Sequence, residues 1–116
     1  MKILLSPAKS LDFESQLPTT QYSSYSFLKQ SIAIDKVLKK QKPKKLMQLM
    51  DISENLAELN WQRNQERNVA AIAPENARQA IYAFSGDVYI GLDAYSLSEN
   101  KINILQDKLR ILSGLY

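Results

Sequence analysis

The chain has 116 residues, of which 45% are hydrophobic and 23% charged, and this composition excludes disordered and collagen-like chains. A globular protein of its mass, 13.2 kDa, has one modest core and exposes about 6,400 Å². Because cysteine and histidine are both absent, disulfides, zinc sites built on these residues and Cys or His nucleophiles are excluded. Any chemistry must therefore use Lys, Asp, Glu, Tyr, Ser or Thr.

The chain opens with a short apolar run, Lys2 to Leu5, that Ser6-Pro7 closes. This pattern predicts a buried strand, and the run is too short for the hydrophobic region of a signal peptide. Ser6 to Thr20 contains two prolines and no apolar periodicity, which predicts a long loop. No segment is apolar enough to span a membrane, so we expect a cytoplasmic protein with no membrane partner.

Three helices are predicted next. Apolar residues recur at helical spacing from Tyr25 to Lys40, with Asp35 and several lysines on the other face. Pro43 interrupts the pattern, and a short helix follows from Lys44 to Met50. Ser53 is a good N-cap for a third helix from Glu54 to about Arg67, whose polar end we expect to be solvated.

The last third of the chain predicts short elements. Pro74 suits the first turn of a helix that runs to Ile81, and an extended segment, Tyr82 to Phe84, follows it. Asp87 to Leu92 is ambiguous between a short helix and a turn. Ser98 caps a final helix with Ile102, Leu105 and Leu109 facing inward. Arg110 to Tyr116 is predicted to be a strand whose partners lie partly outside this sequence.

Three ordered blocks carry a family resemblance. They are Met1-Lys2-Ile3-Leu4-Leu5-Ser6-Pro7-Ala8-Lys9-Ser10-Leu11-Asp12, Pro74 to Ile81 leading to Phe84 to Leu92, and Leu109 to Tyr116. Together they resemble the YaaA family of bacterial peroxide-stress proteins. The resemblance implies a mixed α and β fold with a helix-hairpin-helix element and a positively charged cleft that binds DNA. It also implies a role in limiting the iron-driven damage of hydrogen peroxide stress, and a longer protein of which these residues are the N-terminal part.

A lysine cluster is the first candidate for DNA contact. Six of the 15 basic residues lie within ten positions: Lys36, Lys39, Lys40, Lys42, Lys44 and Lys45. Such density attracts duplex DNA because neutralised phosphates release their condensed counterions. The alternative is a solvated face of two adjoining helices.

The segment from Lys44 to Gln65 is the helix-hairpin-helix candidate. The hairpin would present backbone N–H groups at the start of the second helix to a phosphate. The usual hairpin glycines are absent and Asp51 and Glu54 would repel a phosphate, so an ordinary helical hairpin is the alternative. Trp61 with Arg63 and Arg67 resembles an aromatic and cationic nucleic-acid surface. The alternative is that Trp61 is a packing residue.

The loop at Lys9 and the turn at Gly86-Asp87-Val88-Tyr89 form the other candidate. Lys9, Asp87, Tyr89 and Arg110 together could hold a small anion or nucleotide, as an enzyme or binding domain would. The alternatives are an ion pair of Lys9 with Asp12 or Asp87, and glycines that serve only backbone geometry. Two scattered carboxylates are no ligand set, so we expect no metal and no cofactor.

These observations predict an α+β fold with short strands at both ends, as a single domain over residues 1–116 or the first part of a longer chain. We expect a non-enzymatic stress protein whose partners are DNA and the remaining C-terminal part of the same protein. The residues expected at the DNA are Lys9, Lys39, Lys40, Lys44, Lys45, Ser53, Asn55 and Arg63.

Overall fold

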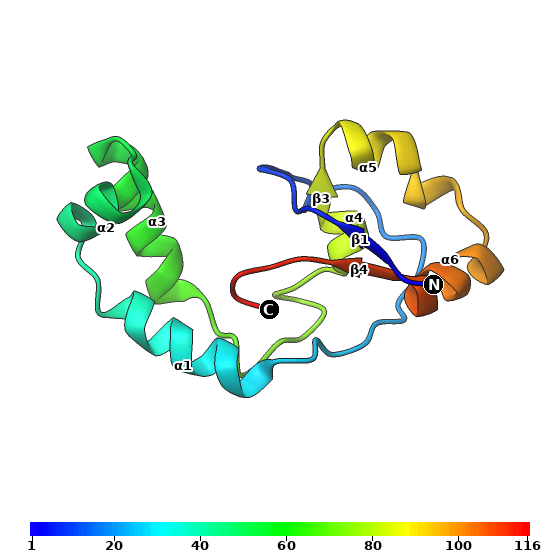
Figure 1. Cartoon of the computed structure of the whole chain (residues 1–116), viewed down its shortest axis with the longest axis horizontal. Coiled ribbons are helices and arrows are strands. Elements are labelled where there is room, and N and C mark those ends of the chain that lie inside the picture. Colours follow the sequence, from blue (N-terminus) through cyan, green and yellow to red (C-terminus); the bar gives the residue numbers. More distant parts are fainter. The chain divides into compact units, whose positions relative to one another are not determined.

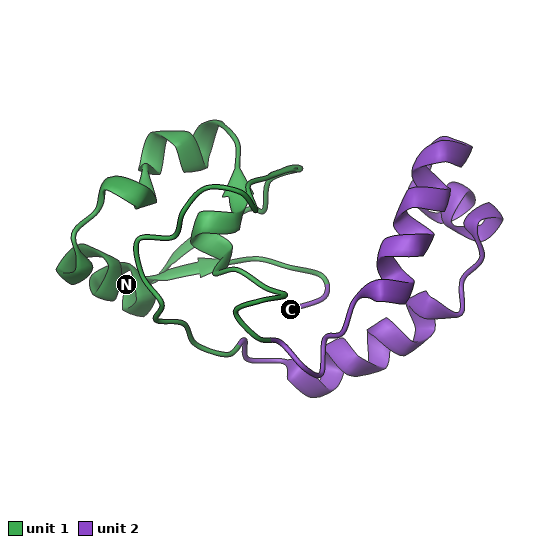
Figure 2. Ribbon diagram, turned by 180° about the vertical axis from the view of Figure 1, so that it is seen from behind, with its two compact units in different colours: residues 1–24, 73–114 green, residues 25–72, 115–116 purple.

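The computed structural model describes all 116 residues and has the predicted α+β fold, with helices and short strands near both ends of the chain (Figure 1). The chain divides into two compact units (Figure 2). Unit 1 comprises residues 1–24 and 73–114, and unit 2 comprises residues 25–72 and 115–116. No helix combines the length and the apolar character needed to cross a membrane.

Unit 1 contains two small sheets. Strand β1, Ile3–Leu5, pairs in parallel with β4, Leu109–Ile111, so that Leu4 lies opposite Arg110. Strand β2, Ser10–Leu11, pairs antiparallel with β3, Phe84–Ser85. The strand predicted near Lys2 to Leu5 is confirmed. Its predicted burial is wrong, because the side chain of Leu4 is 62% exposed.

The final strand is shorter than predicted. Strand β4 ends at Ile111, and the ladder continues only through the hydrogen bond from the Leu112 N–H to the Leu5 carbonyl, 2.9 Å. Leu115 and Tyr116 belong to unit 2, where the Tyr116 ring meets Tyr25 edge-on at 4.8 Å. The last residues therefore pack against a helical unit instead of extending the sheet.

Four short helical segments complete unit 1. They are α4, Ala80–Ala83, α5, Asp87–Leu92, η1, Ala94–Ser96, and α6, Glu99–Lys108. The ambiguous segment at Asp87 is therefore a helix. Ser98 is the N-cap residue of α6, as predicted, although its side chain makes no capping hydrogen bond.

The helix predicted from Pro74 is wrong, because α4 begins only at Ala80. The Asn76 carboxamide oxygen accepts a hydrogen bond from the Ala73 N–H at 2.8 Å, and the Ala73 carbonyl accepts the Asn76 N–H at 3.0 Å. This local turn satisfies backbone groups that would otherwise be hydrogen-bonded within a helix. The side-chain hydrogen bond of Asn76 therefore outweighs the helix propensity of this segment. Tyr82, predicted to be extended, instead lies within α4 and is 2% exposed.

Unit 2 is a three-helix arrangement of α1, Leu28–Lys39, α2, Pro43–Met50, and α3, Glu54–Glu66. All three predicted helices are confirmed. Pro43 is tolerated at the first position of α2, since its missing N–H has no partner there in any helix. Helices α2 and α3 pack closely on Leu46 and Ala57, both fully buried.

The buried face of α1 differs from the prediction. Ser31 and Asp35 are its buried residues, whereas Ile34 and Val37 are 40% and 59% exposed. The Ser31 hydroxyl donates to backbone carbonyls, including that of Leu115, and Asp35 is held by cations. Because these polar groups have hydrogen-bond or ionic partners, their burial costs little. The buried face of α1 is therefore set by these partners and not by the spacing of the apolar residues.

Candidate nucleic-acid interface

Positive charge is concentrated in unit 2. This unit has nine lysines and arginines against five aspartates and glutamates, a formal charge of +4. Unit 1 has six basic and seven acidic residues, a formal charge of −1. The excess charge of the chain therefore belongs entirely to the helical unit.

The end of α1 and the start of α2 carry most of this charge. The exposed lysines there are Lys36, Lys40, Lys42, Lys44 and Lys45. The structure records no ion pair for any of the five. Their ammonium groups are thus available to an external anion, and we call these five residues the lysine patch.

Lys39 differs from its neighbours because it is held within unit 2. Its Nζ atom pairs with the Asp35 carboxylate at 3.1 Å and donates to the Arg67 carbonyl at 2.6 Å. Its side chain is only 33% exposed. Lys39 therefore has a structural role in unit 2. Its ion pair and hydrogen bond compete with the predicted contact to DNA.

Asp35 lies at the centre of a charge cluster that also includes Arg67. The Arg67 Nε and Nη2 atoms donate to Asp35 Oδ1 at 3.0 and 2.8 Å. Burial opposes ionisation of Asp35, but the hydrogen bonds from Arg67 and Lys39 outweigh it and lower the pKa of the carboxyl group. Arg67 at the end of α3 is therefore not solvated as the polar sequence predicted.

The turn between α2 and α3 contains no glycine, and an aspartate occupies its left-handed position. Asp51 adopts the left-handed conformation, φ 51°, which Asp tolerates better than most residues. Ser53 caps α3, and its hydroxyl accepts the Leu56 N–H at 3.4 Å. Asn55 and Arg63 are exposed on α3. The hairpin is present, while its use as a helix-hairpin-helix phosphate site stays a prediction.

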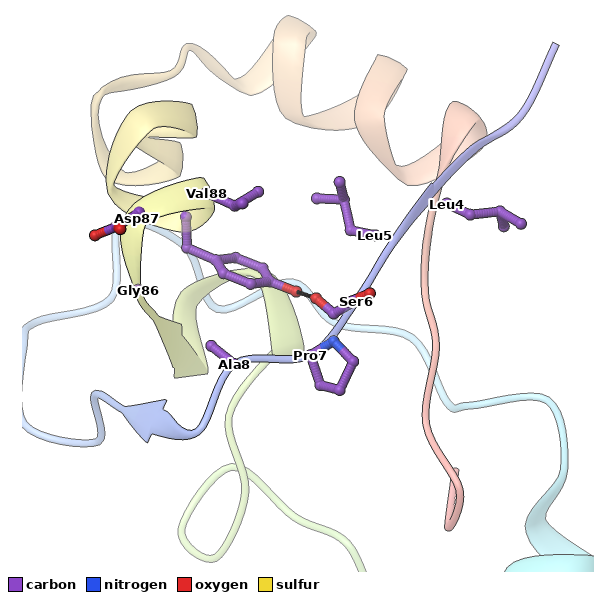
Figure 3. A pocket seen from close by; sticks show the side chains of 9 residues that line it. Leu4, Leu5, Ser6, Pro7, Ala8, Gly86, Asp87 and Val88 are labelled. Carbon is purple, nitrogen blue, oxygen red and sulfur yellow. Dashed lines mark hydrogen bonds between the residues drawn. The ribbon is translucent and has the colours of Figure 1, made fainter.

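The second candidate site lies in unit 1, where Asp87 and Tyr89 line a pocket of about 390 Å³ (Figure 3). Its walls are residues 4–8 of β1 and the following loop, and residues 86–89 at the start of α5. The buried Tyr89 donates its hydroxyl to the Ser6 carbonyl at 2.6 Å and thereby ties α5 to the loop. Burial raises the pKa of Tyr89, so its hydroxyl stays protonated and serves as a donor.

Neither of the two cations predicted for this site lines the pocket. Arg110 donates to the carbonyls of its own helix end, Gln106 at 2.9 Å and Leu109 at 2.7 Å. Lys9 is exposed, does not line the pocket and forms no ion pair, so the alternative pairing with Asp12 or Asp87 is wrong. The pocket wall carries one carboxylate and no cation, which disfavours an anionic ligand.

Sequence reasoning missed the polar cluster of Arg78, Asp12 and Tyr95. Arg78 donates to the Ser15 carbonyl at 2.7 Å, and its Nη1 atom lies 3.7 Å from the Asp12 carboxylate. The Tyr95 hydroxyl accepts a hydrogen bond from Arg78 and donates one to Asp12. Hydrogen bonds from Ser15 lower the pKa of Asp12 to about 2. The only signal was that Asp12 and Arg78 both lie in the family blocks. No group of three or more acidic side chains that could hold a metal occurs in the chain.

Comparison with known proteins identifies the family. A family model described as "Peroxide stress protein YaaA" matches residues 1–116. The chain belongs to this family. It is 60% identical to a UPF0246 protein of Flavobacterium johnsoniae and 57% identical to one of Flavobacterium psychrophilum, over all 116 residues in both cases. A UPF0246 protein of Hahella chejuensis is 49% identical over the same span. The chain spans 46%, 46% and 45% of the length of these relatives.

Proposed function

We propose that the chain is part of a cytoplasmic peroxide-stress protein that binds the phosphate backbone of DNA and helps to limit iron-driven damage to it. The segregation of charge carries this proposal, since unit 2 has a formal charge of +4 and unit 1 of −1. Five exposed, unpaired lysines within ten residues give a density of cations that suits a polyphosphate. The description of the matched family as a peroxide stress protein supports the physiological part.

The lysine side chains, more than the hairpin backbone, make the contact in this proposal. Ser53 already accepts one amide of the α3 N-terminus, and the exposed carboxylates of Asp51 and Glu54 lie beside it. These groups weaken phosphate binding at the hairpin. Asn55 and Arg63 then act as supporting contacts along α3. Sequence preference is slight, because phosphates carry no base identity.

The test is the salt dependence of duplex binding. Replacing Lys40, Lys42, Lys44 and Lys45 by Gln should flatten the slope of log affinity against log salt by about three to four, since each phosphate contact contributes about 0.9. A control quadruple at Lys2, Lys29, Lys101 and Lys108 removes the same charge outside the patch and should change the slope much less. Equal effects of the two quadruples, or a flat slope for the unaltered chain, would refute the proposal.

A substitution of Lys9 distinguishes a DNA contact at this loop from small-anion binding. Its ammonium group is exposed and unpaired, so Lys9→Ala should leave the melting temperature unchanged and lower the salt slope by about one. If the substitution leaves DNA affinity intact but abolishes stabilisation by inorganic phosphate or a nucleotide in a thermal-shift assay, a small-anion site replaces the DNA contact at this loop.

A further inference from the structure

The β1–β4 sheet is an apolar surface with little cover. Ile3, Leu4 and Leu112 are 42%, 62% and 53% exposed. Parallel strands occur almost only in sheets that are covered on both faces, and two strands alone are marginally stable. The pairing of Ile3–Leu5 with Leu109–Ile111 therefore has the character of an inner part of a larger sheet.

The two faces of this sheet carry different side chains. Side chains alternate along a strand, so Leu4 and its partner Arg110 share one face, and Ile3 and Leu5 share the other. The Nη1 group of Arg110 donates to the backbone carbonyls of Gln106 and Leu109, at the junction of α6 and β4. Leu4 itself is 62% exposed on this face.

The pocket continues this surface around β1. Leu4 and Leu5 line it from the strand, and Val88, 59% exposed, lines it from α5 (Figure 3). Gly86 lies so close to Ala8 that a Cβ on it would come within 3.3 Å of the alanine Cβ, so the floor is already packed. What remains is an open hollow of about 390 Å³, which has room for several apolar side chains.

The exposed area of the chain is large for its mass. The chain exposes 8814 Å², against about 6,400 Å² expected for a globular protein of its mass. Two separate globular proteins with the sizes of units 1 and 2 would together expose about 7,700 Å². The excess of about 1,100 Å² over even that reference exceeds the roughly 800 Å² that each partner buries in a stable interface.

We propose that the β1–β4 sheet and the adjoining pocket dock the additional segment that the full-length relatives carry. These relatives are more than twice as long as the matched region, since 116 residues span 46% of their length. The segment adds an extended, apolar strand to the sheet and places apolar side chains in the pocket. The pocket wall carries the Asp87 carboxylate and no cation, which fits an occupant without an anionic group.

A chimera tests this docking surface. The chain is joined to the additional segment of the Flavobacterium johnsoniae relative and compared with the 116-residue chain by hydrogen exchange and thermal melting. The β1 amides should exchange rapidly in the chain alone and become protected in the chimera. A chimera whose β1 amides exchange as fast as those of the chain overturns the proposal.

Two substitutions locate the surface. Leu4→Gln should leave the melting temperature of the chain unchanged and lower that of the chimera by about 5 °C, because only there is Leu4 buried. Leu49→Gln, on α2, is the matched control, since Leu49 is 64% exposed, and it should change neither protein. Equal losses from the two substitutions overturn the assignment. So does a concentration-dependent dimer of the chain that Leu4→Gln abolishes, because a second copy would then be the occupant.

Discussion

At the residue scale, a few polar side chains determine how unit 2 is held together. Asp35 is 5% exposed and receives cations from two elements, Lys39 of α1 and Arg67 after α3. A buried carboxylate of this kind is stable only while its partners remain, because desolvation of a lone charge is costly. The cluster therefore fixes the end of α3 against α1 more specifically than apolar contacts would.

Asp35→Asn should destabilise the chain. The substitution keeps the shape but leaves two cations without their counter-charge, and we expect a loss of about 2 kcal/mol, less than the 3–5 kcal/mol of fully buried pairs because both cations are partly exposed. Urea unfolding followed by the fluorescence of the single tryptophan, Trp61 in α3, measures it within unit 2.

Asp51→Asn is the control for this measurement. Asp51 is exposed and left-handed, a conformation that asparagine also adopts, so its replacement should change stability by no more than about 0.5 kcal/mol. If both variants unfold at the same urea concentration as the unaltered chain, the Asp35 cluster contributes nothing to stability.

At the element scale, the α2–α3 hairpin depends on a small residue. Ala57 is fully buried where α3 meets α2, and fully buried Leu46 lies on the opposing helix. A methyl group at this point lets the two helices approach closely. The short turn at Asp51 to Ser53 then has the length and conformation to connect them.

Ala57→Leu should force α2 and α3 apart. Overpacking of a filled site costs about 1–3 kcal/mol, which urea unfolding measures. Glu58→Leu, which adds a leucine at the exposed neighbouring position, should change stability by no more than about 0.5 kcal/mol. A stability of Ala57→Leu equal to that of Glu58→Leu would mean that the helices tolerate a wider separation.

At the scale of the whole molecule, each unit carries a carboxylate whose ionised form the fold stabilises. In unit 1 hydrogen bonds from Ser15 lower the pKa of Asp12 from 3.8 to about 2. In unit 2 the hydrogen bonds and charges of Arg67 and Lys39 lower the pKa of Asp35 despite its burial. A lowered pKa means that the folded state binds protons less readily than the unfolded state does.

Stability should therefore be level near neutral pH and fall as the pH decreases from about 4 to about 2. Above the unfolded pKa of 3.8 Asp12 contributes its full stabilisation, which is lost as pH falls through the folded pKa of about 2. Thermal melting at a series of pH values measures this. In Asp12→Asn the amide oxygen can still accept the Glu14 and Ser15 N–H groups without titrating, so its curve should fall less steeply. Parallel curves would contradict the assigned role of Asp12.

The sequence by itself determined the helices of unit 2 and the family. Proline at the start of α2, the Ser53 cap and the apolar periodicity act within a few residues, so they specify α1, α2 and α3 almost to their ends. The three family blocks likewise needed no structure. Lys9 and the lysine patch were visible in the sequence as candidate cations, and the structure shows that they are exposed.

Only the tertiary structure decided which polar groups are buried and which strands pair. Asp35 meets Arg67 across 32 positions, and Arg78 reaches the loop after Asp12 across more than 60, distances at which local pattern carries no information. The ion pairs with the buried Asp35 carboxylate gave Lys39 a structural role and tied Arg67 to α1, although both cations stay partly exposed. The physical reason is that burial of a charge depends on a specific partner, which the fold alone supplies.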